Sequence, residues 1–257
     1  MTPKNDKLLE ARQRANEVRK EHERKERRRR VLIQVSIIVG ALVVVGGIAG
    51  AVIAANQAAT VVNVPEASTE VTVNGAGGVP FEVGGTSVTV GDPDAPIALS
   101  LWEDFSCPHC QDYEALIGDT FNDLISKGEI SLEVHSIRFV SNYGANAGSA
   151  ATCVAEHAPD KWLDVRAGLF EIHGAETDLW TDDDFATYLS DEQGITDDAT
   201  LSCVRDGKYA RWILSNTIAA QDAGVEGTPT LFVNGDKSEL LMPEELTEIA
   251  SQASAQG

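Results

Sequence analysis

The sequence predicts an α/β domain that carries an all-helical insertion and is preceded by a single N-terminal transmembrane helix. Three observations predict this class. Residues 31–55 form one uncharged apolar run, strand-like and helix-like patterns alternate from about residue 87, and residues 144–225 have a helical pattern in several pieces. With 257 residues, the chain has room for one core-forming domain with appendages and is too short for three domains.

The N-terminal part is expected to be a charged stem followed by a membrane anchor. Residues 1–30 carry twelve Lys and Arg against six Asp and Glu, with four arginines at positions 27–30. The uncharged residues 31–55 form a helix long enough to cross a hydrocarbon core of about 30 Å. A cleaved signal peptide is the alternative, but both its basic region and its apolar run are usually shorter. The positive-inside rule then places the stem in the cytoplasm and everything after residue 55 outside it.

The rest of the chain is strongly acidic. The 227 residues after the stem hold eight basic and 34 acidic groups, a net charge of −26. Such a surface repels nucleic acids, so we exclude a DNA or RNA partner. Residues 56–86 are rich in Ala, Val, Thr and Gly and include Pro65 and Pro80, which predicts a linker with an extended stretch at 71–73. The folded domain is expected over residues 87–257.

The elements of this domain follow from periodicity and turn residues. Three apolar runs are predicted to be strands: residues 97–102, 130–140 and 230–233. An alternating pair, Val88 and Val90, precedes them. The predicted helices are residues 108–126, the insertion 144–225 with breaks near Pro159, Gly174, Gly194 and Gly207, and a last helix from Pro243. Asn234-Gly235 indicates a hairpin turn, because both central positions of that turn require a positive φ.

The four cysteines fall into two kinds. Cys107 and Cys110 form a C-x-x-C motif between a strand end and a helix start, whereas Cys153 and Cys203 stand singly in the helical block, 50 residues apart. A structural zinc site needs four ligands, usually from two such motifs or a motif plus histidine, and the isolated cysteines do not supply a second one. We therefore interpret Cys107 and Cys110 as a redox pair, and Cys153 and Cys203 as a structural disulfide rather than a second redox pair. Neither a metal site nor a cofactor is expected.

The position of the C-x-x-C motif favours redox chemistry. At a helix start, unpaired backbone N–H groups and the helix dipole stabilise a Cys107 thiolate and lower its pKa from about 8.5. Cys110 then lies one helical turn away, within reach for an easily reduced disulfide. Pro108 suits the first turn because no N–H is needed there. His109 adds to the stabilisation of the thiolate when it is charged.

The motif at residues 105–110, Phe-Ser-Cys-Pro-His-Cys, resembles the active site of the DsbA-like branch of the thioredoxin superfamily. A second segment supports the resemblance, Gly-Thr-Pro-Thr at residues 227–230, directly before the last predicted strand. The resemblance covers about residues 87–257 and implies a thioredoxin-like fold with a helical insertion. It also implies that Pro229 is cis and packs against the cysteine pair, and that Thr228 offers its backbone to a substrate.

The sequence departs from this family at one position. Members of the family carry a buried carboxylate six residues before the first active-site cysteine, where this chain has Leu101. Glu103 faces the same side of the strand as Leu101, because strand side chains alternate. Two roles remain open for Glu103: proton transfer with Cys110, or a solvated acid at the strand end. The neighbouring Asp104 is as consistent with a structural role.

The resemblance implies an extracytoplasmic thiol–disulfide oxidoreductase. We expect a dithiol oxidase that introduces disulfides into exported proteins through Cys107 and Cys110, reoxidised by a membrane quinone-linked partner. A reductase or isomerase of the same fold is one alternative, since Thr228 before the cis-proline also occurs in isomerase-like relatives. A non-catalytic protein that binds Cu(I) through the same two sulfurs is another, against which the scarcity of methionine argues mildly.

Overall fold

The chain divides into two compact units, residues 1–61 and 62–257. The computed structural model describes residues 62–255. The predicted stem at 1–30 and the predicted membrane span at 31–55 lie outside the described residues. Within residues 62–255, no helix combines the length and the apolar character needed to span a bilayer.

A single mixed sheet forms the centre of the domain, with the strand order β1-β2-β3-β5-β4-β6-β7. Its strands are β1 (Ala67–Val73), β2 (Ala76–Gly84), β3 (Ser87–Val90), β4 (Ile97–Glu103), β5 (Ile130–Ser136), β6 (Thr230–Val233) and β7 (Asp236–Ser238). β4 and β5 run parallel, and the other neighbouring pairs are antiparallel. Because β4 pairs with β6, two segments more than a hundred residues apart in the sequence lie side by side, with Leu99 opposite Val233.

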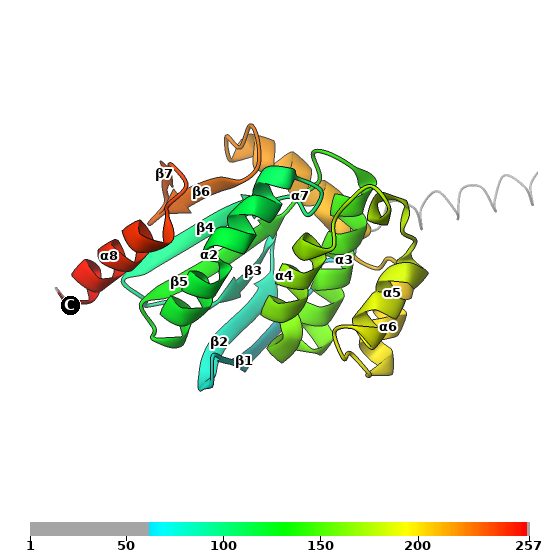
Figure 1. Cartoon of the computed structure of the whole chain (residues 1–257), viewed down its shortest axis with the longest axis horizontal. Helices are drawn as coiled ribbons and strands as arrows, with labels where there is room; N and C mark the ends of the chain where they lie inside the picture. Colours follow the sequence, from blue (N-terminus) through cyan, green and yellow to red (C-terminus); the bar gives the residue numbers. More distant parts are fainter. Residues whose placement is uncertain (1–61, 256–257) are drawn as a thin grey trace, which may run out of the picture. The chain divides into compact units, whose positions relative to one another are not determined.

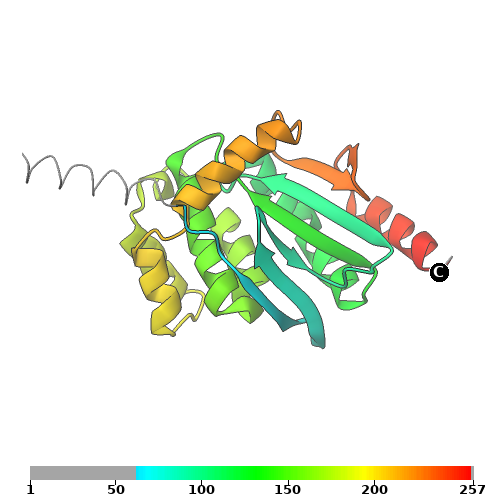
Figure 2. The same ribbon diagram turned by 180° about the vertical axis from the view of Figure 1, so that it is seen from behind.

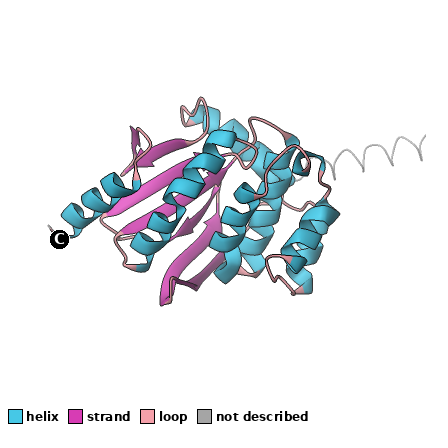
Figure 3. Ribbon diagram, viewed as in Figure 1, coloured by secondary structure: helices cyan, strands magenta, loops and turns pink. Residues whose placement is uncertain are grey.

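Helices cover both faces and one end of this sheet (Figures 1, 2 and 3). They are α2 (Pro108–Ser126), α3 (Asn142–His157), α4 (Trp162–Glu171), α5 (Asp182–Asp191), α6 (Asp198–Arg205), α7 (Ala210–Asp222) and α8 (Pro243–Ser254). α2 and α8 lie on one face, α7 lies on the opposite face, and α3 to α6 gather at one end (Figures 1 and 2). The expected α/β fold with an all-helical insertion is confirmed, since α3 to α7 separate β5 from β6.

The prediction that residues 56–86 form a linker is wrong for most of that segment. Residues 67–84 form the hairpin of β1 and β2, and its alternate apolar side chains are buried: Val71, Val73, Val79, Phe81 and Val83. Asn74 and Gly75 make the turn, with φ angles of 48° and 83°. The frequent Gly and the Pro80 concealed an alternating pattern, and the sheet begins at Ala67 rather than near residue 87.

Other predicted elements are confirmed with small changes. The helix at 108–126 has the expected bounds, α8 begins at Pro243, and the Asn234-Gly235 turn has positive φ at both positions. The strand predicted for residues 130–140 ends at Ser136. It ends there because the next residues leave the sheet and hydrogen-bond to the loop that precedes α2.

Candidate active site

The C-x-x-C motif lies where β4 passes into α2. Cys107 is the N-cap residue of α2 with extended backbone angles, and Pro108 follows in the first turn. The backbone N–H groups of Cys110 and Gln111 both donate to the Cys107 carbonyl, which starts the helix. Both cysteines are free thiols, with exposed fractions of 5% for Cys107 and 3% for Cys110. The expected geometry, one sulfur at the helix start and the other one turn further along, is present.

The two thiols have opposite pKa shifts. The pKa of Cys107 falls from 9.0 to about 5, mainly because the Cys110 thiol hydrogen-bonds to its sulfur. Burial opposes this shift. The side chain of Thr228 and the backbone N–H groups of Cys110 and His109 favour it by hydrogen bonding to the thiolate. The pKa of Cys110 is strongly raised, because this hydrogen bond holds its proton and because the side chain is buried. At neutral pH the pair therefore carries one thiolate, on Cys107.

The loop before β6 completes the surroundings of Cys107. The Thr228–Pro229 peptide bond is cis. The Cys107 thiol approaches the Thr228 carbonyl, with 3.3 Å between sulfur and oxygen. The Thr230 hydroxyl donates to the Gly227 carbonyl at 2.8 Å and fixes the turn. The structure thus places Thr228 next to Cys107 and has the cis bond before Pro229, as the family resemblance implies.

A groove of about 440 Å³ lies beside this loop. Its lining combines the N-terminal half of α2, the cis-proline loop and the segment before α8: His109, Asp112, Tyr113, Leu116, Thr228, Pro229, Leu240 and Met242. Leu116, Leu240 and Met242 are exposed although they are apolar. An exposed apolar groove next to a reactive sulfur is suited to hold an extended peptide segment.

Glu103 is not a solvated acid at the strand end. Its side chain and that of Arg166 are each 2% exposed, and the guanidinium holds the carboxylate through Nε at 3.0 Å and Nη2 at 2.5 Å. Arg166 also donates from Nη1 to Glu114 at 2.5 Å. These three residues form a buried charged triad that joins β4, α2 and α4. Sequence reasoning missed Arg166 and Glu114, although Glu114 lies on the apolar face of α2, where a carboxylate needs a partner.

The surroundings of Glu103 in the triad raise the pKa of its carboxyl group. Burial raises its pKa and outweighs the opposing effect of Arg166, and the nearby Glu114 and Asp104 raise the pKa further. For Arg166, burial favours the neutral form, but the two carboxylates outweigh it and raise its pKa. The charge of Glu103 is also one of the causes that raise the pKa of Cys110, so the two groups interact electrostatically.

Comparison with known proteins agrees with this geometry. The thioredoxin family model matches residues 84–251. The chain belongs to the thioredoxin family. Disulfide bond formation protein D of Bacillus subtilis is 24% identical over 147 residues, which are 56% of this chain and 66% of that protein. The probable disulfide bond formation protein D of Bacillus cereus is 22% identical over 157 residues, 59% of this chain and 71% of that protein. This chain thus matches about two thirds of the length of these relatives.

Solved structures point to the same branch of the thioredoxin family. Reduced DsbA from Mycobacterium tuberculosis is 25% identical, with a TM-score of 0.56 over 66% of this chain and 93% of that one. Reduced DsbG from the same organism is 27% identical, with a TM-score of 0.54 over 64% of this chain and 83% of that one. The resemblance seen in the sequence is confirmed, and this thioredoxin-family chain is a DsbA-like thiol–disulfide oxidoreductase.

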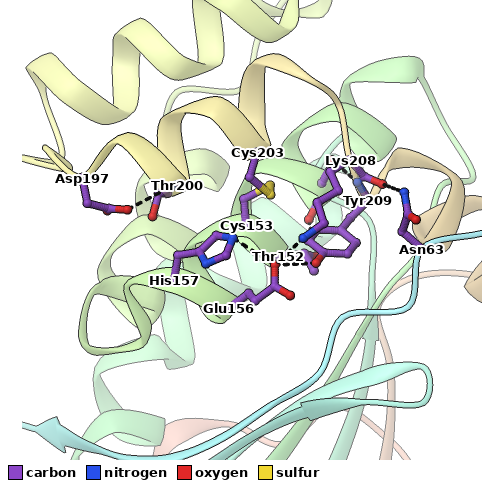
Figure 4. Close-up of a disulfide and its surroundings, with 12 residues drawn as sticks. Asn63, Thr152, Cys153, Glu156, His157, Asp197, Thr200, Cys203, Lys208 and Tyr209 are labelled. Atoms are coloured by element: carbon purple, nitrogen blue, oxygen red, sulfur yellow. Dashed lines mark hydrogen bonds and ion pairs between the residues drawn. A yellow bond between two sulfur atoms is a disulfide. The ribbon is translucent and has the colours of Figure 1, made fainter.

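The other two cysteines of this thioredoxin-family chain form a disulfide, drawn in Figure 4. Cys153 of α3 and Cys203 of α6 are joined, with 5.8 Å between their Cα atoms and both side chains buried. Beside it, Lys208 and Tyr209 donate to the Glu156 carboxylate (Figure 4). Within the described residues, ligand-type atoms of Glu156, His157 and Cys203 also lie close together. The Cys203 sulfur is in the disulfide and is not a thiolate, so this group is not suited to hold a metal.

Proposed function

We propose that this protein is an extracytoplasmic dithiol oxidase that introduces disulfides into exported proteins. The lowered pKa of Cys107, about 5 against 9.0 for an ordinary cysteine, carries the proposal. A stabilised thiolate stabilises the reduced enzyme and makes its disulfide reactive. At pH 7 the Cys107 thiolate is favoured about 100-fold over the thiol. This stabilises the reduced enzyme by roughly 2.7 kcal/mol, which raises the reduction potential of a two-electron couple by about 60 mV.

The reaction consists of two thiol–disulfide exchanges. A substrate thiolate attacks the Cys107 sulfur of the Cys107–Cys110 disulfide, a mixed disulfide forms, and Cys110 leaves as a thiolate. A second substrate thiolate then attacks the substrate sulfur of the mixed disulfide and releases the Cys107 thiolate. The substrate loses two electrons and gains a disulfide, and the enzyme is left with its pair reduced.

Glu103 supplies the proton that Cys110 needs in the first exchange. In the reduced pair, the hydrogen bond with Cys107 and burial raise the pKa of Cys110. Burial still acts in the mixed disulfide, where Cys107 carries no charge, so a nearby acid assists the departure of the buried sulfur. Burial raises the pKa of Glu103, which allows it to carry that proton. Of the two roles left open by the sequence, the burial of Glu103 therefore supports proton transfer.

The substrate is held as an extended segment across Thr228 and Pro229. The groove has an exposed apolar lining that includes Leu116, Leu240 and Met242. Such a lining is suited to bind apolar side chains, which folded proteins bury. Newly exported chains expose such side chains together with free thiols. This supports unfolded or partly folded proteins as substrates.

The location of the reaction rests on the sequence. The basic stem, the apolar run at 31–55 and the positive-inside rule support an anchored domain outside the cytoplasm. The Cys153–Cys203 disulfide adds support, because structural disulfides persist in oxidising compartments. An anchored site is close to the bilayer, which suits reoxidation by a membrane partner linked to quinone.

The proposal is tested with the full-length protein in detergent, oxidised and mixed with a reduced two-cysteine substrate. We expect stoichiometric oxidation of the substrate and reduction of the Cys107–Cys110 pair. Cys107→Ser should abolish the reaction, and Cys110→Ala should accumulate the mixed disulfide. The Cys107→Ser protein still contains the Cys153–Cys203 disulfide, so it serves as the control for transfer from that bond. Electron flow from the reduced enzyme to a disulfide substrate, without the reverse, would instead indicate a reductase.

A further inference from the structure

The Asp104 carboxylate is buried and fully occupied. The residue is 0% exposed, and each of its carboxylate oxygens accepts two hydrogen bonds. Oδ1 accepts from the backbone N–H and the hydroxyl of Ser106, at 2.8 and 2.6 Å. Oδ2 accepts from the backbone N–H groups of Phe139 and Val140, at 2.6 and 2.8 Å. Four donors match the four lone-pair positions of a carboxylate, so an amide of the same shape would accept only two of these hydrogen bonds.

These bonds join two loops. Ser106 belongs to the loop between β4 and α2, directly before Cys107, whereas Phe139 and Val140 lie between β5 and α3. A further bond runs from the Ser141 backbone N–H to the Ser106 hydroxyl, at 3.0 Å. Ser141 is the N-cap residue of α3, the first helix of the insertion. The loop that carries Cys107 is thus fastened to the start of the helical insertion.

Gly144 shows how closely α3 approaches this carboxylate. A Cβ atom at this position would overlap Oδ1 of Asp104 and would lie 2.9 Å from the Ser106 hydroxyl. Glycine inside a helix is destabilising relative to alanine. The close approach of the carboxylate explains why α3 has a glycine in its first turn.

The main chain of Asp104 contacts both active-site cysteines. Its carbonyl accepts the Cys107 backbone N–H at 2.9 Å. The hydrogen bond with Cys107 and burial raise the pKa of Cys110, and a hydrogen bond from the Asp104 backbone to the Cys110 sulfur opposes them by favouring the thiolate. A movement of residue 104 therefore changes the positions of both sulfurs relative to the backbone groups around them.

We propose that Asp104 is a positioning residue, which locks the loop before Cys107 onto the first helix of the insertion and so fixes both sulfurs against their backbone partners. This role rests on the proposed redox function. The carboxylate hydrogen-bonds to the two loops, so it affects the cysteines by fixing the position of the loop before Cys107. The insertion then takes part in setting the properties of the redox pair.

Asp104→Asn is the first test, because it keeps the shape and replaces one oxygen with an NH₂ group. That group faces two donors, so two of the four hydrogen bonds are lost. The full-length protein is reduced in detergent, two thiols per chain are verified, and the Cys107 thiolate is titrated by its ultraviolet absorbance. We expect a Cys107 pKa higher by about one unit and a tenfold shift of the equilibrium with glutathione toward the disulfide form, about 30 mV.

The direction of the shift separates positioning from simple charge. Removal of a negative charge near a thiolate lowers the thiol pKa. A raised Cys107 pKa in Asp104→Asn therefore comes from the loop, and a lowered or unchanged pKa would overturn the proposal. Leu189→Ala, a core substitution in α5, is the matched control: it should lose stability and leave the Cys107 pKa unchanged.

Ser106→Ala keeps the proposal testable if Asp104→Asn does not fold. It retains the carboxylate and removes the hydroxyl that bridges Asp104 and Ser141. We expect a smaller rise of the Cys107 pKa in this variant, and an unchanged value would overturn the positioning role. An ordinary Cys107 pKa in the unsubstituted protein would overturn the proposed function instead, because the role of Asp104 rests on it.

Discussion

The stability of the reduced protein should depend on pH through Cys107. Its pKa is lowered from 9.0 to about 5 on folding. Between these two values the unfolded chain binds more protons than the folded one, so the free energy of unfolding rises with pH. The slope is about 1.4 kcal/mol per pH unit. The contribution is complete above pH 9, falls as the pH falls, and is lost below pH 5.

From pH 4 to pH 7 the gain is about 2.7 kcal/mol for the reduced protein. The oxidised protein is the control, because neither cysteine of its pair titrates and the groups outside the pair are the same in both forms. Urea unfolding of both forms of the 62–257 unit at several pH values measures the difference in free energy. A difference between reduced and oxidised forms that stays constant from pH 4 to pH 7 would refute the assignment of a stabilised thiolate to Cys107.

Three further substitutions test other parts of the account. Arg166→Met leaves the two buried carboxylates without their cation and should cost about 3–5 kcal/mol in urea unfolding, and a loss below about 1 kcal/mol would contradict the triad. Glu103→Gln removes the acid that protonates Cys110 and should slow mixed-disulfide formation at pH 7 by about 10²-fold in stopped-flow measurements, whereas an unchanged rate would rule out this proton route. Cys203→Ser opens a loop of 50 residues and should cost roughly 4 kcal/mol of stability. The same variant should keep the reduction potential of the Cys107–Cys110 pair, and a shifted potential would indicate coupling between the two pairs.

Local sequence signals predict most of the fold, but one hairpin is hidden by its composition. Asn234-Gly235 predicts the turn between β6 and β7, and the structure has that turn. Asn74-Gly75 is the same dipeptide and also has positive φ at both positions, but it lies in residues 56–86, where the composition predicts a linker. The reason is that Pro80 and several glycines mask the alternation of buried valines in β1 and β2. Pro80 lies within a strand paired on both sides, where proline is uncommon.

The candidate site was predictable where its parts are short motifs. The C-x-x-C motif indicates the cysteine pair, and the Thr-Pro segment indicates the cis-proline loop through the family resemblance. Arg166 gave no such signal, because its two partners are 63 and 52 residues away in the sequence. A contact of that kind depends on how α4 packs on α2, which no local pattern encodes. The four hydrogen bonds of Asp104 were hidden for the same reason, since two of their donors come from the loop after β5.

The most direct test of the central claim is the reduction potential of the Cys107–Cys110 pair in the full-length protein, equilibrated in glutathione buffers. No other free thiols interfere, because the remaining two cysteines form the Cys153–Cys203 disulfide. A dithiol oxidase should have an oxidising potential, well above about −200 mV and toward the value of about −120 mV known for DsbA. A potential near or below about −250 mV, in the range of thioredoxin, would contradict the proposed dithiol oxidase and indicate a reductase.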